Sequence, residues 1–134
     1  TRQIRLRSRI ELTEFGRGSE PISRGFMAYQ DVIWSMKKVP LRIAARYALF
    51  DTDNFDSRIY AYENDVLYFF SIPAYSGRGT RAYILLKYDL GQNTDIWLRW
   101  AQTYFTDRQI VGSGLEEIDG NTRTEVKIQV RHRF

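Results

Sequence analysis

The sequence predicts an all-β fold, an antiparallel up-and-down meander of about seven long strands. Three observations lead to this prediction. Apolar and polar residues alternate with a period of two in one segment after another. These segments run for about ten to fourteen residues, longer than an average strand of a soluble protein. Clusters of Gly, Pro, Asn, Asp and Ser separate them. The 134 residues suit one domain, and we treat 1–134 as a single unit.

The alternation is clearest in the first and last segments. In segment 4–13, apolar residues take every second position except at Ser8, and Arg, Glu or Thr lie between them. In segment 126–134, apolar residues take every second position except at His132, and Lys, Gln or Arg lie between them. A helix would distribute these charges around its circumference, whereas a strand places them on one face.

The middle segments repeat this pattern less strictly. Segments 41–49, 82–90 and 96–104 each keep their charged residues on one face. Segment 24–37 also permits a helical interpretation, because some of its apolar residues recur at helical spacing. We expect a strand there because its neighbours are strands.

One further segment, 58–70, completes the seven. Glu63-Asn64-Asp65 interrupts it, so a bulge or a turn is expected at that point. Among the connections, Gly91-Gln92-Asn93-Thr94 is the clearest tight hairpin.

Composition excludes several classes of protein. The net charge of +4 permits nucleic acid, anionic lipid headgroups or acidic solutes as partners without selecting one. The absence of cysteine excludes a disulfide scaffold, a thiol nucleophile and a cysteine zinc site. The longest strongly apolar run, 66–70, is far shorter than the roughly 20 residues of a transmembrane helix. The chain opens at Thr1 rather than Met, so either a leader has been removed or this is the end of a longer protein, and we expect the second.

The same alternation fits a soluble β-barrel or a membrane one, which differ in the face that meets the core. Segment length favours the membrane, since a tilted spanning strand needs about nine to eleven residues. Aromatic residues that can form interfacial girdles gather near segment ends: Tyr47, Tyr60, Tyr62, Tyr88, Trp97, Trp100 and Tyr104. We therefore expect a transmembrane β-barrel in the bacterial outer membrane, with apolar side chains toward lipid and charged ones toward a polar lumen.

The closing run carries a family resemblance. Apolar residues at every second position before the terminal Phe134 resemble the C-terminal signal of bacterial outer-membrane barrels, which the barrel-assembly machinery reads. The corresponding residues are Val126, Ile128, Val130, His132 and Phe134. His132 departs from the pattern, where an apolar or aromatic residue is usual.

A second resemblance covers nearly the whole chain. Runs 50–65, 70–75 and 112–121 resemble the C-terminal region of Bacteroidota proteins labelled helix-hairpin-helix domain-containing. Those proteins join a small DNA-binding-like module to a large barrel-like region. The module is absent here, so the resemblance implies a barrel and carries over no DNA-binding residue.

The basic residues that the alternation sorts to one face are the main candidate site. We expect these to face the lumen: Arg5, Arg7, Arg9, Arg42, Arg46, Arg81, Lys87, Arg99, Lys127, Arg131 and Arg133. They could attract anions into an open lumen. They could instead pair across strands with Glu11, Asp31, Glu63, Asp65, Asp89 and Glu125, which we favour because the two signs are evenly mixed.

Other candidate sites are weaker. Asp51, Asp53 and Asp56 could offer oxygens to Ca²⁺, but the run lacks the EF-hand pattern, and Asp is a common turn residue. His132 is the only histidine, and no serine has an evident partner position for a catalytic triad. The glycine clusters match no phosphate-binding loop. We expect neither an enzyme nor a bound cofactor.

Two soluble alternatives remain open. A basic β-domain that binds nucleic acid would use the net charge and the aromatic residues interleaved with arginine. A lipocalin-like carrier would need an apolar cavity and normally a helix after its last strand. The strand length and the terminal Phe134 favour the barrel, and we do not expect nucleic acid as a partner of this segment.

The barrel also requires more wall than this chain supplies. A natural single-chain barrel has at least about eight strands, and an open edge in lipid leaves backbone groups unpaired. We expect N-terminal sequence or another chain to complete it, with lipid and the assembly machinery as the other partners.

Overall fold

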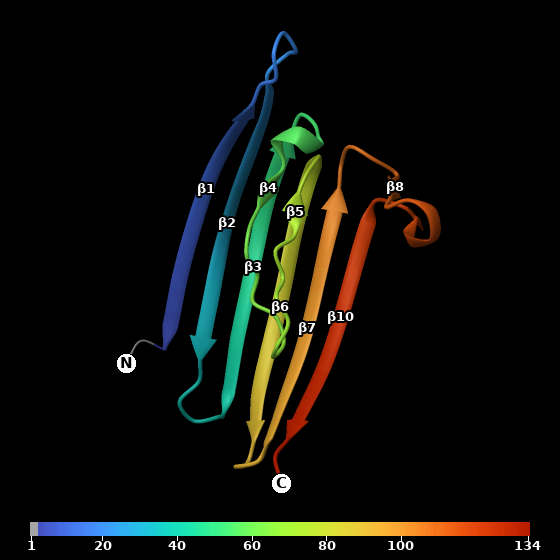
Figure 1. Ribbon diagram of the computed structural model, residues 1–134. Coiled ribbons are helices and arrows are strands. Elements are labelled where there is room, and N and C mark those ends of the chain that lie inside the picture. The colour runs from blue at the N-terminus through green and yellow to red at the C-terminus, as the bar shows by residue number, and fades with distance from the viewer. Residues whose placement is uncertain (1–2) are drawn as a thin grey trace.

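The computed structural model describes residues 3–134, and its main feature is one sheet of six antiparallel strands (Figure 1). Each strand of this sheet pairs with the sheet strands that precede and follow it in the chain, which confirms the antiparallel meander. The strands in spatial order are β1 (Ile4–Phe15), β2 (Ser23–Ser35), β3 (Leu41–Thr52), β6 (Arg78–Leu90), β7 (Thr94–Phe105) and β10 (Thr122–His132).

Two details of this sheet agree with the sequence. Segment 24–37 lies largely in β2, which pairs with β1 on one side and β3 on the other, so the helical interpretation is wrong. Residues 91–93 form the β6–β7 turn, which brings Leu90 opposite Thr94. Gly91 has a φ of 72°, a conformation that favours glycine in such turns.

Segment 58–70, expected as a seventh long strand, is not part of the sheet. In that segment, β4 (Ile59–Tyr60) pairs with β5 (Ala74–Tyr75), and Glu63 forms an isolated antiparallel bridge with Ser71. We call residues 59–75 the strap, because they fold back over one face of the sheet in front of β3 and β6 (Figure 1). Glu63-Asn64-Asp65 causes the difference, since these residues bind groups of the sheet and do not extend a strand.

The other short elements lie outside the sheet. A 3-10 turn η1 (Phe55–Ser57) precedes the strap, and a small hairpin of β8 (Ile110–Val111) and β9 (Ile118–Asp119) carries a second turn, η2 (Gly114–Glu116). In the described part of the chain, no helix has the length and apolar character needed to cross a membrane.

The strand register is continuous, so rows of side chains cross the whole sheet on the same face. One row runs through Ile4, Trp34, Ile43, Leu86, Leu98 and Ile128. Another row of this face runs through Leu6, Val32, Ala45, Ile84, Trp100 and Val126. The described chain does not cover this apolar face, which we call the open face.

The opposite face, which we call the strap face, holds the buried residues. Between the two apolar rows, it carries the row Arg5, Ile33, Ala44, Leu85, Arg99 and Lys127. Two small apolar clusters lie between the strap and the sheet, one around Met27, Phe50 and Tyr75 and the other around Val66 and Trp97. The sheet is open, and among residues 3–134 β1 and β10 each pair on one side only.

Candidate functional site

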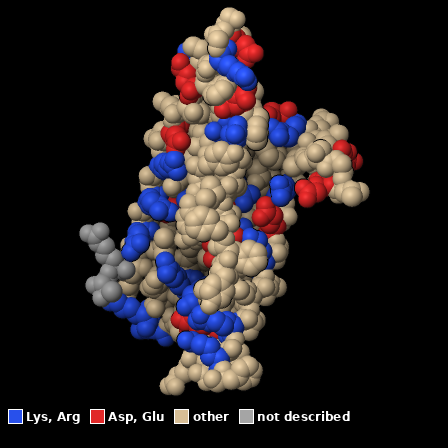
Figure 2. Space-filling view, viewed as in Figure 1, with Lys and Arg blue, Asp and Glu red and all other residues tan. Residues whose placement is uncertain are grey.

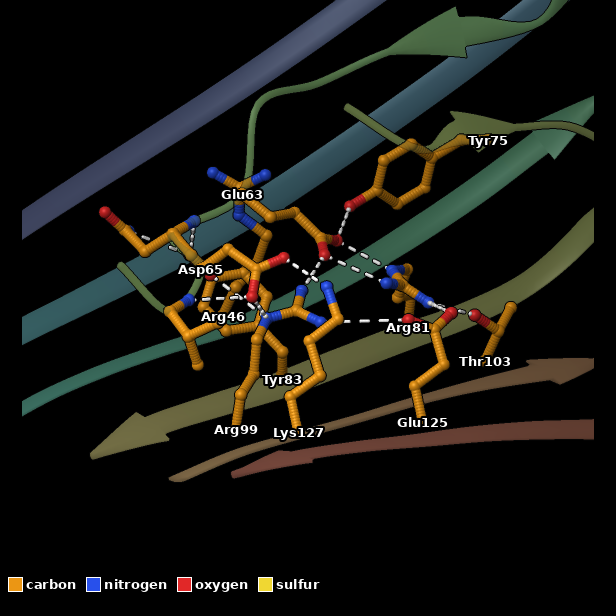
Figure 3. A network of polar contacts seen from close by, with 12 residues as sticks. Arg46, Glu63, Asp65, Tyr75, Arg81, Tyr83, Arg99, Thr103, Glu125 and Lys127 are labelled. Carbon is orange, nitrogen blue, oxygen red and sulfur yellow. Dashed lines mark hydrogen bonds and ion pairs between the residues drawn. The ribbon is translucent and has the colours of Figure 1, made fainter. Parts of the chain in front are cut away.

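The strap face is centred on a buried carboxylate, Glu63, which has no exposed surface. Its two oxygens accept hydrogen bonds from Arg81 Nε at 2.7 Å, Arg81 Nη2 at 2.9 Å and Arg99 Nη2 at 2.5 Å. The Tyr75 hydroxyl donates a further bond to Oε1 at 2.8 Å. Figure 3 shows how the strap brings Glu63 down onto arginines of β6 and β7. A buried carboxylate needs such partners, because an unpaired charge there is costly.

Asp65 extends this network toward the C-terminal strand. Lys127 Nζ of β10 donates to Asp65 Oδ2 at 2.6 Å, and Arg99 Nε lies 3.7 Å from Oδ1. Glu125, also on β10, lies 3.8 Å from Arg99 and 3.9 Å from Arg81. The strap therefore joins β6, β7 and β10 through charged side chains (Figure 3).

A second buried pair lies on the other half of the sheet. Arg46 of β3 binds Asp31 of β2 through two hydrogen bonds, Nε to Oδ1 at 2.6 Å and Nη2 to Oδ2 at 2.9 Å. Arg7 of β1 adds a bond to the same Oδ2 at 2.6 Å. The Arg46 guanidinium also lies 3.6 Å from the centre of the Tyr29 ring, a cation–π contact.

The protonation of the strap groups follows from these contacts. Burial alone would raise the pKa of Glu63, but the hydrogen bonds and positive charge of Arg81, with Tyr75 and Arg99, hold it below its ordinary value. Burial raises the pKa of the Tyr75 hydroxyl, and the negative charge of Glu63 raises it further. Glu63 is therefore ionised and Tyr75 is a proton donor at neutral pH.

Two tyrosines and one amide fix the strap in addition to the charges. The Tyr83 hydroxyl accepts from Asn64 through the backbone N at 3.2 Å and the side-chain Nδ2 at 3.0 Å. The Tyr75 ring packs edge-on against Phe50, with centroids 5.5 Å apart. These contacts leave the strap bound at several points along its length.

The register places ten of the eleven predicted basic site residues on the strap face, but in different surroundings. The eleventh, Arg133, follows β10, and its Nη2 lies 3.8 Å from Asp95 Oδ2. Arg46, Arg81 and Arg99 are buried, whereas Arg5 and Arg42 are exposed. The carboxylate partners expected for them include Asp31, Glu63 and Asp65, and all three bind these cations. Figure 2 shows basic and acidic side chains interspersed around an uncharged central area.

Sequence reasoning missed how two of these carboxylates reach the arginines. Glu63 and Asp65 were expected on a neighbouring strand, and they instead come from the strap. Tyr75, Tyr83 and Thr103, which accepts a bond from Arg81 Nη1 at 2.7 Å, were not anticipated as part of the network. The sequence signal that could have indicated this arrangement was the interruption of the strand pattern at residues 63–65.

Two of the three suggested calcium residues use their carboxylates in other hydrogen bonds. Asp51 accepts from Arg78 Nε at 3.0 Å, and Asp53 accepts from the backbone N of Arg24 at 2.8 Å. The backbone N of Asp56 donates to the Asn54 side chain, which caps η1. Within residues 3–134, no three acidic or histidine side chains are grouped as metal ligands.

The residues of the expected assembly signal lie on β10 or just beyond it. Val126, Ile128 and Val130 are on the open face and are 61–71% exposed. His132 Nδ1 lies 2.8 Å from Thr94 Oγ1, and its ring contacts Phe134 edge-on.

Comparison of the chain with known protein families, curated proteins and solved structures gives no match.

Proposed function

We propose that this chain forms part of the wall of an outer-membrane β-barrel, with the open face toward lipid and the strap face toward the barrel interior. One observation carries the proposal: the apolar rows are exposed across the sheet, and the charged residues at the centre of the opposite face are covered. Leu6, Ile10 and Ile128 are 66%, 75% and 71% exposed, whereas Arg46 and Arg99 are 3% and 1% exposed. This is the side-chain distribution of a membrane barrel strand.

If the protein were soluble, the exposure of the apolar open face would need another explanation. Soluble monomers rarely expose a large contiguous apolar patch, and this one extends over all six strands. In a lipid bilayer these side chains would contact acyl chains instead of water, so their exposure at the protein surface would be favourable.

The nucleic-acid alternative has less support from the geometry. Phosphate binding requires accessible Arg and Lys side chains. Here Arg46, Arg81 and Arg99 are buried and bind Asp31 or Glu63. The aromatic rings beside them, Tyr75 and Tyr83, are also buried and so offer no stacking platform.

The network favours a structural role for this part of the wall over an open anion pathway. The strap occupies the strap face, and its carboxylates neutralise the central arginines. Anion attraction through the centre of this face would need central cations that are free to meet solvent. Paired side chains of both signs instead join neighbouring strands and hold the strap in place.

The three tryptophans provide a direct test. Trp34 and Trp100 belong to the rows of the open face, whereas Trp97 lies on the strap face and is 5% exposed. Single-tryptophan variants, each with the other two changed to Phe, are reconstituted in liposomes that contain phospholipid with brominated acyl chains. Bromine quenches tryptophan fluorescence on contact.

We expect strong quenching of Trp34 and Trp100 and little quenching of Trp97. The W97F/W100F, W34F/W97F and W34F/W100F variants serve as one another's controls. Equal quenching of all three, or no quenching by lipid at all, would contradict the proposal. Protection of Trp34 and Trp100 by a protein partner in solution would support a soluble assembly.

A further inference from the structure

The free edge of β1 is long and regular. β1 pairs with β2 one-to-one from Ile4 to Phe15, without a bulge, and contains no proline. Sheet edges that must stay unpaired are usually short, bulged, interrupted by proline or protected by charged side chains. Of these features β1 has only the charges, and the strands β3 and β6, which are paired on both sides, carry charges on the strap face as well. Ser8 and Thr13 are the only uncharged polar members of β1, and the apolar side chains of its open face continue the rows of the sheet. The edge therefore has the geometry of a strand that pairs on both sides.

The strap face of β1 has more positive than negative charge. Arg5, Arg7 and Arg9 project there, against the single carboxylate of Glu11. Arg7 shares Asp31 with Arg46, and Arg9 pairs with Glu11 on its own strand. Among residues 3–134, no carboxylate lies within ion-pair distance of Arg5.

The opposite edge of the sheet cannot supply the missing charge. The strap face of β10 carries Arg123, Lys127 and Arg131, against the single carboxylate of Glu125. Glu125 already lies close to Arg81, Arg99 and Arg123. Pairing β1 with β10, within one chain or between two copies, would bring two basic rows together, and like charges on paired strands are unfavourable.

We infer that the free edge of β1 binds an antiparallel strand from outside residues 3–134 that carries Asp or Glu on its strap face and apolar residues on its open face. The inference rests on the proposed function, because only a barrel wall requires this edge to be closed. It deepens that proposal by giving the chemistry of the neighbouring strand. A carboxylate opposite Arg5 would form the ion pair that the described chain lacks.

The test converts Arg5 into a group that a zero-length reagent can link. Carbodiimide joins a lysine amine to a carboxylate in direct contact and does not act on arginine. The R5K variant of the protein is produced in its native membrane, treated with carbodiimide, digested and analysed by mass spectrometry. Lys127, whose Nζ is 2.6 Å from Asp65 Oδ2, is the internal positive control.

The matched control is R42K. Arg42 is also exposed on the strap face, and none of residues 3–134 forms an ion pair with it, but β3 is paired on both sides. We expect R5K to give a new cross-linked peptide between β1 and an acidic residue outside residues 3–134. We expect this peptide to be absent from the wild type and from R42K.

Three results would overturn the inference. The first is a link from Lys at position 5 to Glu125 or another carboxylate of this chain, which would mean self-closure or, if it joins differently labelled copies, a dimer. The second is no link from R5K while the Lys127–Asp65 link forms. The third is an equal link from R42K, which would mean a generally acidic interior. Tryptophan quenching reports the membrane location separately, so the two proposals can fail independently.

Discussion

Glu63 and Arg81 lie 18 residues apart in the chain and are joined side to side by two hydrogen bonds, Nε to Oε1 at 2.7 Å and Nη2 to Oε2 at 2.9 Å. This two-point geometry fixes direction as well as distance, which a single bond does not. Because Glu63 is on the strap and Arg81 on β6, the pair sets where the strap lies on the sheet. The stability of the strap should therefore depend on this carboxylate.

Replacing Glu63 with Gln should release the strap. The substitution keeps the shape of the side chain but leaves Arg81 and Arg99 without their buried counter-charge, which typically costs about 3–5 kcal/mol. We expect faster hydrogen exchange in peptides from residues 59–75 and a lower free energy of unfolding in detergent. Glu117→Gln, in the exposed loop after η2, is the control and should change neither. Unchanged exchange in the strap of E63Q would contradict this role.

Acid should release the strap in the wild type. The pKa of Glu63 is below its ordinary value of 4.5 in the folded protein, so its contribution to stability is complete above pH 4.5 and is lost as the pH falls through the lower, folded-state pKa. We expect strap exchange, corrected for the intrinsic effect of pH, to stay constant from neutral pH to about 4.5 and to rise below it. In E63Q this rise should disappear. A rise of equal size in E63Q would assign the transition to other carboxylates.

Removing the Tyr83 hydroxyl should weaken the strap at a second point. Tyr83→Phe leaves the backbone N and the side-chain Nδ2 of Asn64 without their acceptor. Asn64 is half-buried, so we expect a loss of about 1 kcal/mol, at the lower end of the cost of an unsatisfied buried donor. Tyr47→Phe makes the same change on the open face, where the hydroxyl has no hydrogen-bond partner among residues 3–134, and should stay within about 0.5 kcal/mol of the wild type. Denaturant unfolding measures the free energy of unfolding of both variants, and an equal decrease in the two would contradict the prediction.

A charge introduced on the open face should cost more at mid-strand than at the strand end. Leu98 lies near the middle of β7, and Thr122 begins β10 on the same face. If the open face meets lipid, Leu98→Arg should cost about 2–4 kcal/mol and Thr122→Arg about 0–1 kcal/mol. Unfolding from liposomes in denaturant measures both. A cost that does not depend on position would disagree with a lipid-facing wall.

The close approach of η1 to β2 should make Gly25 intolerant of a side chain. A Cβ at Gly25 would lie 2.3 Å from the backbone oxygen of Ser57 and 2.7 Å from Thr13 Cγ2. Gly25→Ala should displace η1, with a loss of about 1–3 kcal/mol and faster exchange in residues 53–58. Gly16→Ala, whose Cβ would lie 3.7 Å from Ile22 Cγ1, is the control. Wild-type exchange in residues 53–58 of G25A would show that the contact is not required.

The strands were predictable because alternation is a local property. In β1 and β10 each residue faces opposite to the next, so polarity along the chain indicates the two faces without knowledge of the partner strand. The same logic identified which cations share a face with Arg46, Arg81 and Arg99. It predicted β2 as well, where helical spacing competed, because an isolated helix between strands would leave its neighbours without partners.

The strap was not predictable in the same way. Its apolar residues suggested a strand, and only the folded chain shows that Glu63 and Asp65 bind arginines on β6 and β7 that lie far from them in sequence. Such contacts depend on how the strands align, and no short stretch of sequence encodes that alignment. Tyr75 joined the network for the same reason, since the fold of the strap brings its hydroxyl to Glu63.

The sequence by itself therefore determined the six long strands, the tight turn at 91–93 and the separation of apolar from charged faces, because each arises from residues close together in the chain. The tertiary structure decided that the central part of the charged face is covered and neutralised from within the chain while the apolar face stays bare. The physical reason is that burial and ion pairing are set by distances between residues remote in sequence, which exist only once the sheet has assembled.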